Sequence, residues 1–127
     1  MRKLSACLLL AALSQSAWAI DTADQQRLSR IQQSWAHIQY EVVEKQRAAA
    51  FEQLSTQASQ FTNERPTLAE AWIWKGIVTS SWAGAEGGLG ALGKAKDAKA
   101  DLEKSLSLDP KALQGSAYTS LAALYDR

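Results

Sequence analysis

Apolar residues recur along this chain at the three- and four-residue spacing of an α-helix. The first stripe consists of Leu28, Ile31, Trp35 and Ile38. It predicts a helix over residues 22–40 with one buried face, and Thr22 with Gln25 as a capping box. A second stripe consists of Phe51, Leu54, Ala58 and Phe61. It predicts a helix over residues 41–61. Since no segment alternates with the two-residue period of a strand, we expect an all-α fold.

The third predicted helix, over residues 67–83, has apolar residues on all of its sides. Its start carries a second capping-box pattern, Thr67 with Glu70. The apolar residues nearly encircle it: Leu68, Ala71, Trp72, Ile73, Trp74, Ile77, Val78 and Trp82. A helix of this kind is buried by neighbours on several sides, so we expect it at the centre of the fold.

A glycine-rich stretch, residues 84–90, separates this helix from a highly charged one. We expect the stretch to be an insertion between the two helices, and the charged helix to begin at Ala91 or Leu92 and end at Leu108. Its charges have mixed signs, which indicates a solvated face. Asp109 as N-cap and Pro110 at the first helical position predict a fifth helix that continues to Arg127.

Spaced aromatic and small residues suggest an internal repeat. The phrases Trp72-x2-Lys75-Gly76 and Tyr118-x2-Leu121-Ala122-x2-Tyr125 share one spacing, and Ala98-x3-Leu102-x2-Ser105-x4-Pro110 lies between them. Together they resemble the tetratricopeptide repeat, in which small residues let paired helices approach closely. Two departures stand out: Lys75 and Thr79 replace a leucine and a tyrosine. Pro66 and Pro110 are also 44 positions apart, against 34 in the standard repeat.

The resemblance implies stacked antiparallel helix pairs that form a short right-handed solenoid. Residues 20–66 would be a degenerate first pair, residues 67–110 a second pair, and residues 111–127 the first helix of an incomplete repeat. The glycine-rich segments 87–93 and 115–118 also resemble a group of exported bacterial repeat proteins. A repeat helix cannot bury its face alone, so we expect no covering helix for Tyr118, Leu121, Ala122 and Tyr125. This predicts either a truncated chain or a cover supplied by another molecule, including self-association.

The resemblance also implies a function. Members of this family bind a peptide or protein segment on the concave surface formed by the first helix of each pair. The corresponding positions here are Glu70, Ile73, Ile77, Ser80, Ser116, Thr119 and Ala123. We therefore expect a non-enzymatic interaction or scaffold module. The alternative is an accessory component of a solute transporter or another envelope assembly that oligomerises and holds a small ligand.

The first nineteen residues read as a secretory signal peptide. A basic start is followed by an apolar run from Leu4 to Leu13 and by the A-x-A sequence ending at Ala19. We expect cleavage after Ala19, a periplasmic or secreted protein and no stable membrane insertion. The alternative, lipid attachment at Cys7, would leave almost no apolar run before the cleavage site. Cleavage would remove Cys7, the single cysteine, and with it any disulfide, thiolate metal site or cysteine nucleophile.

Charge and chemical motifs narrow the function further. The net charge is +1, and it would be −1 once Arg2 and Lys3 are removed. Neither value favours a nucleic-acid partner. Residues 88–93 spell G-x-G-x-x-G, but no strand precedes them, so we expect no nucleotide site. His37 has no second histidine beside it, and we interpret it as a surface residue. We therefore expect no catalytic residue, metal or cofactor.

Overall fold

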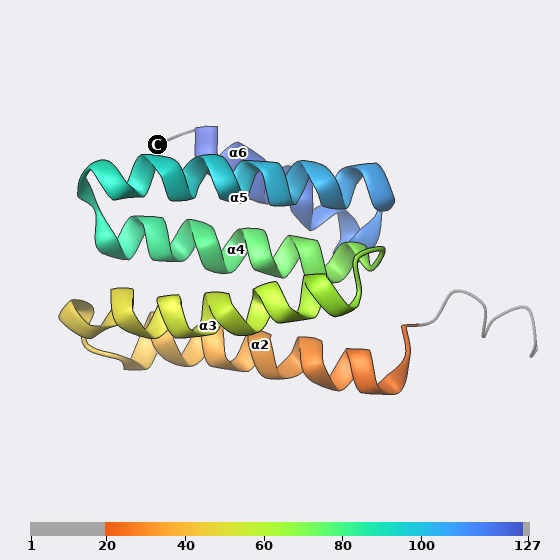
Figure 1. Cartoon of the computed structure of the whole chain (residues 1–127), viewed down its shortest axis with the longest axis horizontal. Coiled ribbons are helices and arrows are strands. Elements are labelled where there is room, and N and C mark those ends of the chain that lie inside the picture. The colour runs from red at the N-terminus through yellow and green to blue at the C-terminus, as the bar shows by residue number, and fades with distance from the viewer. Residues whose placement is uncertain (1–19, 126–127) are drawn as a thin grey trace, which may run out of the picture.

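Helices make up most of the computed structural model, which describes residues 20–125. They are α2 (Thr22–Glu41), α3 (Glu44–Glu64), α4 (Ala69–Glu86), α5 (Gly88–Leu108), the short 3₁₀ helix η1 (Ala112–Gly115) and α6 (Ser116–Tyr125). Successive helices α2 to α5 lie antiparallel, with α4 between α3 and α5 (Figure 1). The described residues contain no strand, so the predicted all-α class is confirmed. The predicted signal peptide, residues 1–19, lies outside the described residues.

The starts of the helices are set by residues other than those predicted. Asp21 is the N-cap of α2, and its carboxylate accepts a hydrogen bond of 2.8 Å from the backbone N–H of Ala23. Leu68 is the N-cap of α4 and makes no side-chain cap hydrogen bond. Both predicted capping boxes are therefore wrong. An acidic side chain one residue earlier satisfies the first orphan donors of α2, and α4 begins without such a partner.

The glycine-rich stretch does not form an insertion. Helix α4 continues to Glu86 and α5 begins at Gly88, so only Gly87 separates them. Gly87 has φ +67° and ψ −171°, a conformation that is open to glycine and strained for other residues. The extra length relative to a standard repeat therefore lengthens the two helices, because helices tolerate the remaining glycines at a modest energetic cost.

The predicted fifth helix is interrupted. Asp109 ends α5 as its C-cap, and its carboxylate accepts a hydrogen bond of 3.0 Å from the backbone N–H of Lys111. Three consecutive residues with positive φ follow: Leu113, Gln114 and Gly115. These left-handed residues turn the chain before α6 begins at Ser116. Pro110 therefore precedes a turn and a 3₁₀ segment instead of opening a continuous helix.

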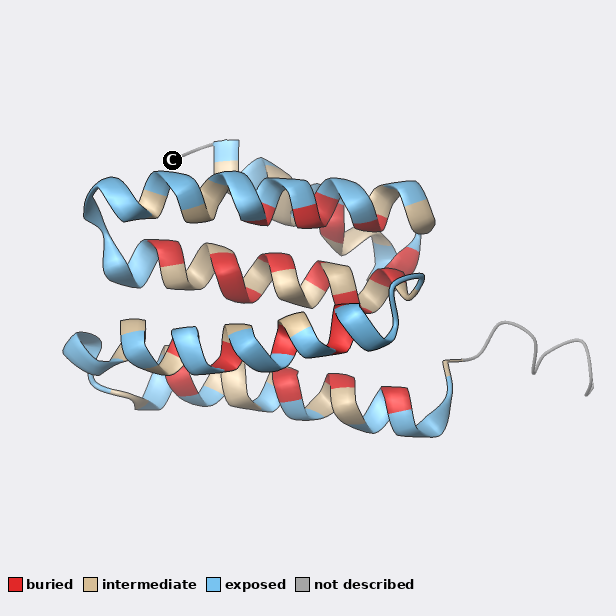
Figure 2. Cartoon of the chain, viewed as in Figure 1, coloured by how far each residue is buried: buried red, intermediate tan, exposed pale blue. Residues whose placement is uncertain are grey.

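Helix α4 supplies residues to the two hydrophobic clusters found in residues 20–125. Cluster 1 joins α4 to α2 and α3 and contains Leu28, Ile31, Ile38, Phe51, Leu54, Phe61, Ala71 and Val78. Cluster 2 joins α4 to α5, η1 and α6 and contains Ala69, Ile73, Leu102, Ala112 and Ala117. Trp74 packs against both clusters. Figure 2 shows buried residues along α4 up to its exposed last turn, and its contacts with α2, α3, α5 and α6 confirm its predicted central position.

Helices α4 and α5 approach closely through small residues. A Cβ atom on Gly76 would lie 2.7 Å from Leu102 Cγ and 3.2 Å from the backbone oxygen of Ala98. Ala98, Leu102 and Ser105 are fully buried on the facing side of α5. The burial of these residues agrees with the packing roles predicted for them, since a side chain on Gly76 would require Leu102 or the backbone of α5 to move.

Candidate binding groove

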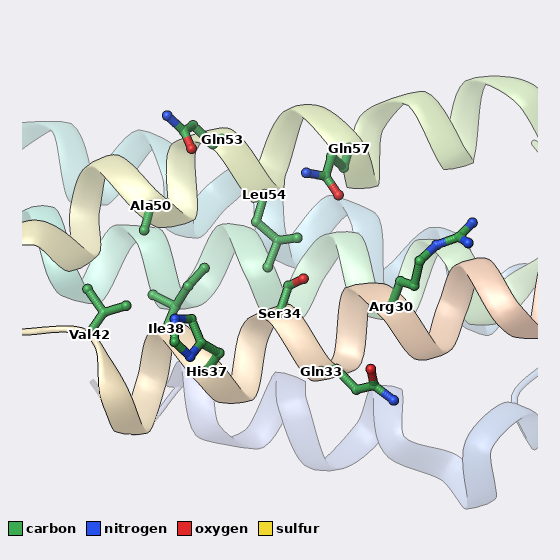
Figure 3. A pocket seen from close by; sticks show the side chains of 10 residues that line it. All are labelled: Arg30, Gln33, Ser34, His37, Ile38, Val42, Ala50, Gln53, Leu54 and Gln57. Carbon is green, nitrogen blue, oxygen red and sulfur yellow. The ribbon is translucent and has the colours of Figure 1, made fainter.

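A groove of about 580 Å³ lies between α2 and α3. Its floor is apolar and consists of Ile38, Val42, Ala50 and Leu54. Its rim is polar and consists of Arg30, Gln33, Ser34, His37, Gln53 and Gln57. In Figure 3 these side chains point from α2 and α3 towards the viewer, while α4 and α5 lie behind the pair. The groove therefore opens on the side of the first helix pair that α4 does not cover.

The amino-acid spacing on the two helices explains both the floor and the rim. Ile38 and Leu54 belong to the stripes that form cluster 1, so their inner atoms are buried. The residues next to these stripes on the solvent side carry amide, hydroxyl, guanidinium and imidazole groups, which form the walls. The short link of Val42 and Val43 closes one end, where the Arg47 guanidinium donates a 2.9 Å hydrogen bond to the Val42 oxygen.

A second, smaller cavity of about 140 Å³ extends the groove towards the start of α2. It is lined by Arg27, Arg30, Ile31, Gln57 and Gln60. Arg30 and Gln57 border both cavities. The combined groove therefore offers basic groups, side-chain amides and apolar surface along the α2–α3 interface, and none of the residues that line it is acidic.

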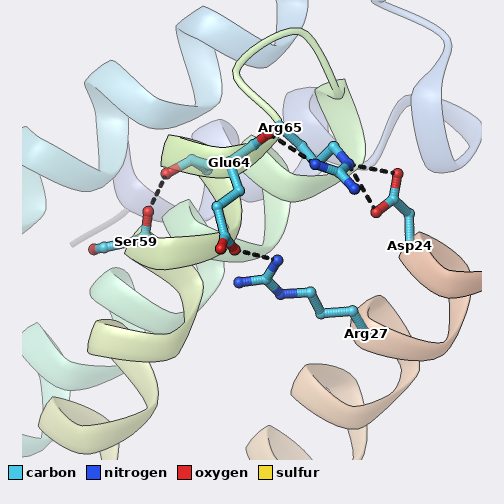
Figure 4. A network of polar contacts seen from close by, with 6 residues as sticks. Asp24, Arg27, Ser59, Glu64 and Arg65 are labelled. Carbon is cyan, nitrogen blue, oxygen red and sulfur yellow. Dashed lines mark hydrogen bonds and ion pairs between the residues drawn. The ribbon is translucent and has the colours of Figure 1, made fainter.

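Ion pairs hold the far end of the groove in place. Arg65, at the end of α3, donates from Nε to both carboxylate oxygens of Asp24 on α2, at 3.0 and 3.1 Å (Figure 4). Arg27 pairs with Glu64 at 2.5 Å, and its guanidinium lies 4.8 Å from the ring centre of Phe61. Asp24 is buried, so its charge-assisted bonds to Arg65 fix the position of the first turn of α2.

The histidine on the rim pairs with a carboxylate. His37 Nδ1 lies 2.6 Å from Glu41 Oε2, one turn along the same exposed helix face. No third group orients this pair towards a nucleophile among the described residues. Within residues 20–125 there is also no group of three or more metal-ligating side chains.

The residues predicted for the concave surface are only partly accessible. Ile73 is completely buried in cluster 2, so it cannot contact a partner, and its assignment to a binding surface is wrong. Ile77 packs against the same cluster. Glu70, Ser80 and Ser116 are partly exposed, and Thr119 and Ala123 on α6 are exposed. The seven predicted residues thus lie partly in the core and partly at the surface.

The tyrosines of α6, for which no covering helix was predicted, are exposed. Tyr118 and Tyr125 are 58% and 68% exposed, and Ala122 is exposed as well. Leu121 instead packs against cluster 2. Of the four residues predicted to lie uncovered, three are therefore accessible and one belongs to the interior.

The tryptophans take part in packing and in internal hydrogen bonds. Trp35 Nε1 donates to Ser81 Oγ at 2.8 Å, and its ring makes an edge contact with Trp74, with ring centres 5.8 Å apart. Trp72 Nε1 donates to the Pro66 oxygen at 2.9 Å. Both donors are thus satisfied internally, as expected of tryptophans at the edge of a core.

A buried ion pair between α4 and α5 was missed by the sequence analysis. Lys75 Nζ lies 2.8 Å from Asp101 Oδ1, while Asp101 Oδ2 is buried without a hydrogen-bond partner. Burial raises the pKa of Asp101, and Lys75 opposes that shift. The sequence pattern predicted a solvated position for Asp101, because most residues around it are also charged and nothing in the sequence marks this one as buried.

The fold defines an all-α protein of antiparallel packed helices that carries an open groove on its first helix pair. Comparison with known proteins found no matching family model, no matching curated protein and no matching solved structure. The resemblance to tetratricopeptide repeats therefore stays a prediction that rests on the sequence phrases. Within residues 20–125, no helix has the length and apolar character needed to cross a membrane.

Proposed function

We propose that this protein is a non-enzymatic interaction module that binds a peptide or protein segment in the α2–α3 groove. The observation that carries the proposal is the groove itself, with an apolar floor between walls of side-chain amides and a volume of about 580 Å³. Apolar pockets with a few polar groups are the usual form of binding sites. Glutamine amides both donate and accept hydrogen bonds, so they suit the exposed backbone of an extended segment.

The rigidity of the groove supports this function. Asp24, Arg65, Arg27 and Glu64 link the two helices at one end, and Arg47 braces the link at the other. A preformed groove costs less ordering free energy on binding than a flexible one. The groove is not the concave surface that the family resemblance implies. Some of the residues expected on that concave surface lie in the core.

An exported location and an accessory role in an envelope assembly extend this proposal. Export rests on the signal-peptide pattern of residues 1–19. An accessory role would draw on the exposed tyrosines of α6 for self-association. Light scattering of the purified protein tests this self-association directly, since a protein that acts alone is a monomer in solution.

Selection from a random peptide library on the immobilised protein tests the proposed function. We expect enriched peptides whose binding falls at least tenfold with Ala50→Trp, which fills the groove floor. Ala49→Trp is the matched control, because Ala49 is exposed and does not line the groove. Gln53→Trp on the exposed rim provides a second blocking variant if Ala50→Trp lowers the melting temperature. Failure to enrich peptides, or equal binding by the blocked variants, overturns the proposal.

A further inference from the structure

The α2–α3 groove has an unbalanced set of charges. Its lining contains the guanidinium groups of Arg27 and Arg30 and the imidazole of His37, and no carboxylate. Two of these groups already have acidic partners outside the lining, since Arg27 pairs with Glu64 and His37 with Glu41. Arg30 is exposed and makes no hydrogen bond or ion pair with any other residue of the described part.

Arg30 lies where a segment bound in the groove would meet its free guanidinium. Arg30 borders both the large and the small cavity, so a segment in the groove passes beside it. Figure 3 shows its guanidinium at one end of the groove, directed away from the apolar floor. A guanidinium binds a carboxylate through two parallel hydrogen bonds, a geometry that few other groups match.

Three lysines of α4 and α5 have acidic partners, whereas Lys96 and Lys104 of α5 make no ion pair with a described residue but lie outside the groove. Lys94 pairs with Glu86, Lys99 lies 3.8 Å from Glu103, and Lys75 lies 2.8 Å from Asp101. These basic groups have acidic partners on the protein itself. The groove therefore combines an unpaired guanidinium, an acid-free lining and an apolar floor, all of them accessible from one side.

From this combination we infer that the groove selects a protein segment in which a carboxylate side chain lies beside apolar side chains. The inference rests on the proposed function and names the chemistry of its partner. The carboxylate binds Arg30, while the apolar side chains contact the floor near Leu54 and Ala50. Arg30 and His37 are seven residues apart on α2, which is about 10 Å along a helix, so an extended segment spans this part of the groove in about three residues.

The same library selection, followed by direct binding measurements, tests the inference. We expect the enriched peptides to carry aspartate or glutamate within about four residues of large apolar side chains. Fluorescence polarisation with one such peptide should show binding at least fivefold weaker for Arg30→Gln than for the native protein. Lys96→Gln removes the same charge from an exposed residue of α5 that lies outside the groove, and it should leave binding unchanged. Arg30 makes no hydrogen bond or ion pair with another described residue, so neither variant should alter the melting temperature by much.

The outcomes separate this inference from the proposed function. Enrichment of neutral or basic peptides that still lose binding in Ala50→Trp overturns the acidic partner and leaves the groove as a binding site. Equal binding by Arg30→Gln and the native protein has the same meaning. A complete lack of enrichment overturns both proposals. Both an acidic peptide and an oligonucleotide supply anionic groups. If a single-stranded oligonucleotide displaces the peptide with comparable affinity, the assignment to an acidic protein segment is overturned.

Discussion

The two helix pairs of this protein share one arrangement and differ in how tightly they pack. In the α4–α5 pair, Gly76 lies against Leu102 and the backbone of Ala98, so at this point α4 contributes no side chain between the two helices. In the α2–α3 pair, Leu28, Phe51 and Phe61 fill one side of the interface. The other side of that interface remains open as the groove of about 580 Å³.

This difference shows how the size of interface residues makes one helix pair tightly packed and leaves a candidate binding groove on the other. The distance between packed helices depends on the side chains at the contact. Small residues bring the two helices of the second pair close together. Bulky residues on one side of the first pair leave space on the other, where polar side chains form a wall around an apolar floor.

Truncation of a leucine in each pair should give the largest effects. We expect Leu102→Ala to lower the free energy of unfolding by about 4–5 kcal/mol and Leu54→Ala by about 2–3 kcal/mol. Both leucines are buried, with Leu102 0% and Leu54 2% exposed, but Leu54 also borders the groove, so its truncation enlarges an existing open space whereas Leu102→Ala creates a closed cavity. Urea unfolding of both variants measures the difference. Equal losses would contradict the contrast in packing.

Addition of one methyl group at the close contact should have the next largest effect. Gly76→Ala should lower the free energy of unfolding by about 1–3 kcal/mol, because the new Cβ would clash with Leu102 and crowd Ala98. Gly93→Ala is the matched control, since a Cβ there meets no atom within 4 Å. It should raise the free energy of unfolding by about 0.5–1 kcal/mol through helix propensity. Thermal unfolding of both variants would show whether the signs are opposite.

Removal of the hydrogen bond that joins the two pairs should have a smaller effect. Ser81→Ala leaves the Trp35 indole N–H without its 2.8 Å partner, and we expect a loss of about 1 kcal/mol. Ser107→Ala removes an exposed hydroxyl that bonds only within α5, and it should change stability by less than about 0.5 kcal/mol. Urea midpoints measure both, and an unchanged midpoint for Ser81→Ala would show that the bond contributes nothing to joining the pairs.

The smallest effect concerns the pH dependence of the tightly packed pair. Burial raises the pKa of Asp101 above its value in the unfolded chain. Between those two pKa values the folded state binds more protons, so this group's contribution to the free energy of unfolding falls as pH rises. Relative to Asp101→Asn, the native protein should therefore gain stability as pH is lowered from 7 to 4. Urea unfolding at both values tests this, and a difference independent of pH would contradict a raised pKa.

Much of the fold follows from local patterns. The stripe from Leu28 to Ile38 marked α2 because a helix repeats its faces every three or four residues. Gly76 and Ala98 were recognisable as close-contact positions from the repeat phrases. The helix caps were less predictable, because Asp21 and Thr22 are both suitable cap residues and only the geometry selects Asp21.

The candidate site was harder to recognise. The glutamines that wall the groove are typical of any solvated helix face, and nothing in their spacing distinguishes a wall from open surface. Ile73 illustrates the opposite problem, since its position in the repeat phrase suggested a binding surface while its side chain is fully buried. Asp101 was assigned to the surface because neither its burial nor its contact with Lys75 can be recognised from the sequence alone.

The sequence by itself determined the helical class, the central position of α4 and the close contact at Gly76, because each depends on side-chain periodicity and size within a short stretch. Only the tertiary structure decided that the first pair stays open, that Arg30 has no internal partner and that Asp101 is buried. These properties arise where residues distant in sequence meet. Their physical cause is the relative position of packed helices, which no local pattern specifies.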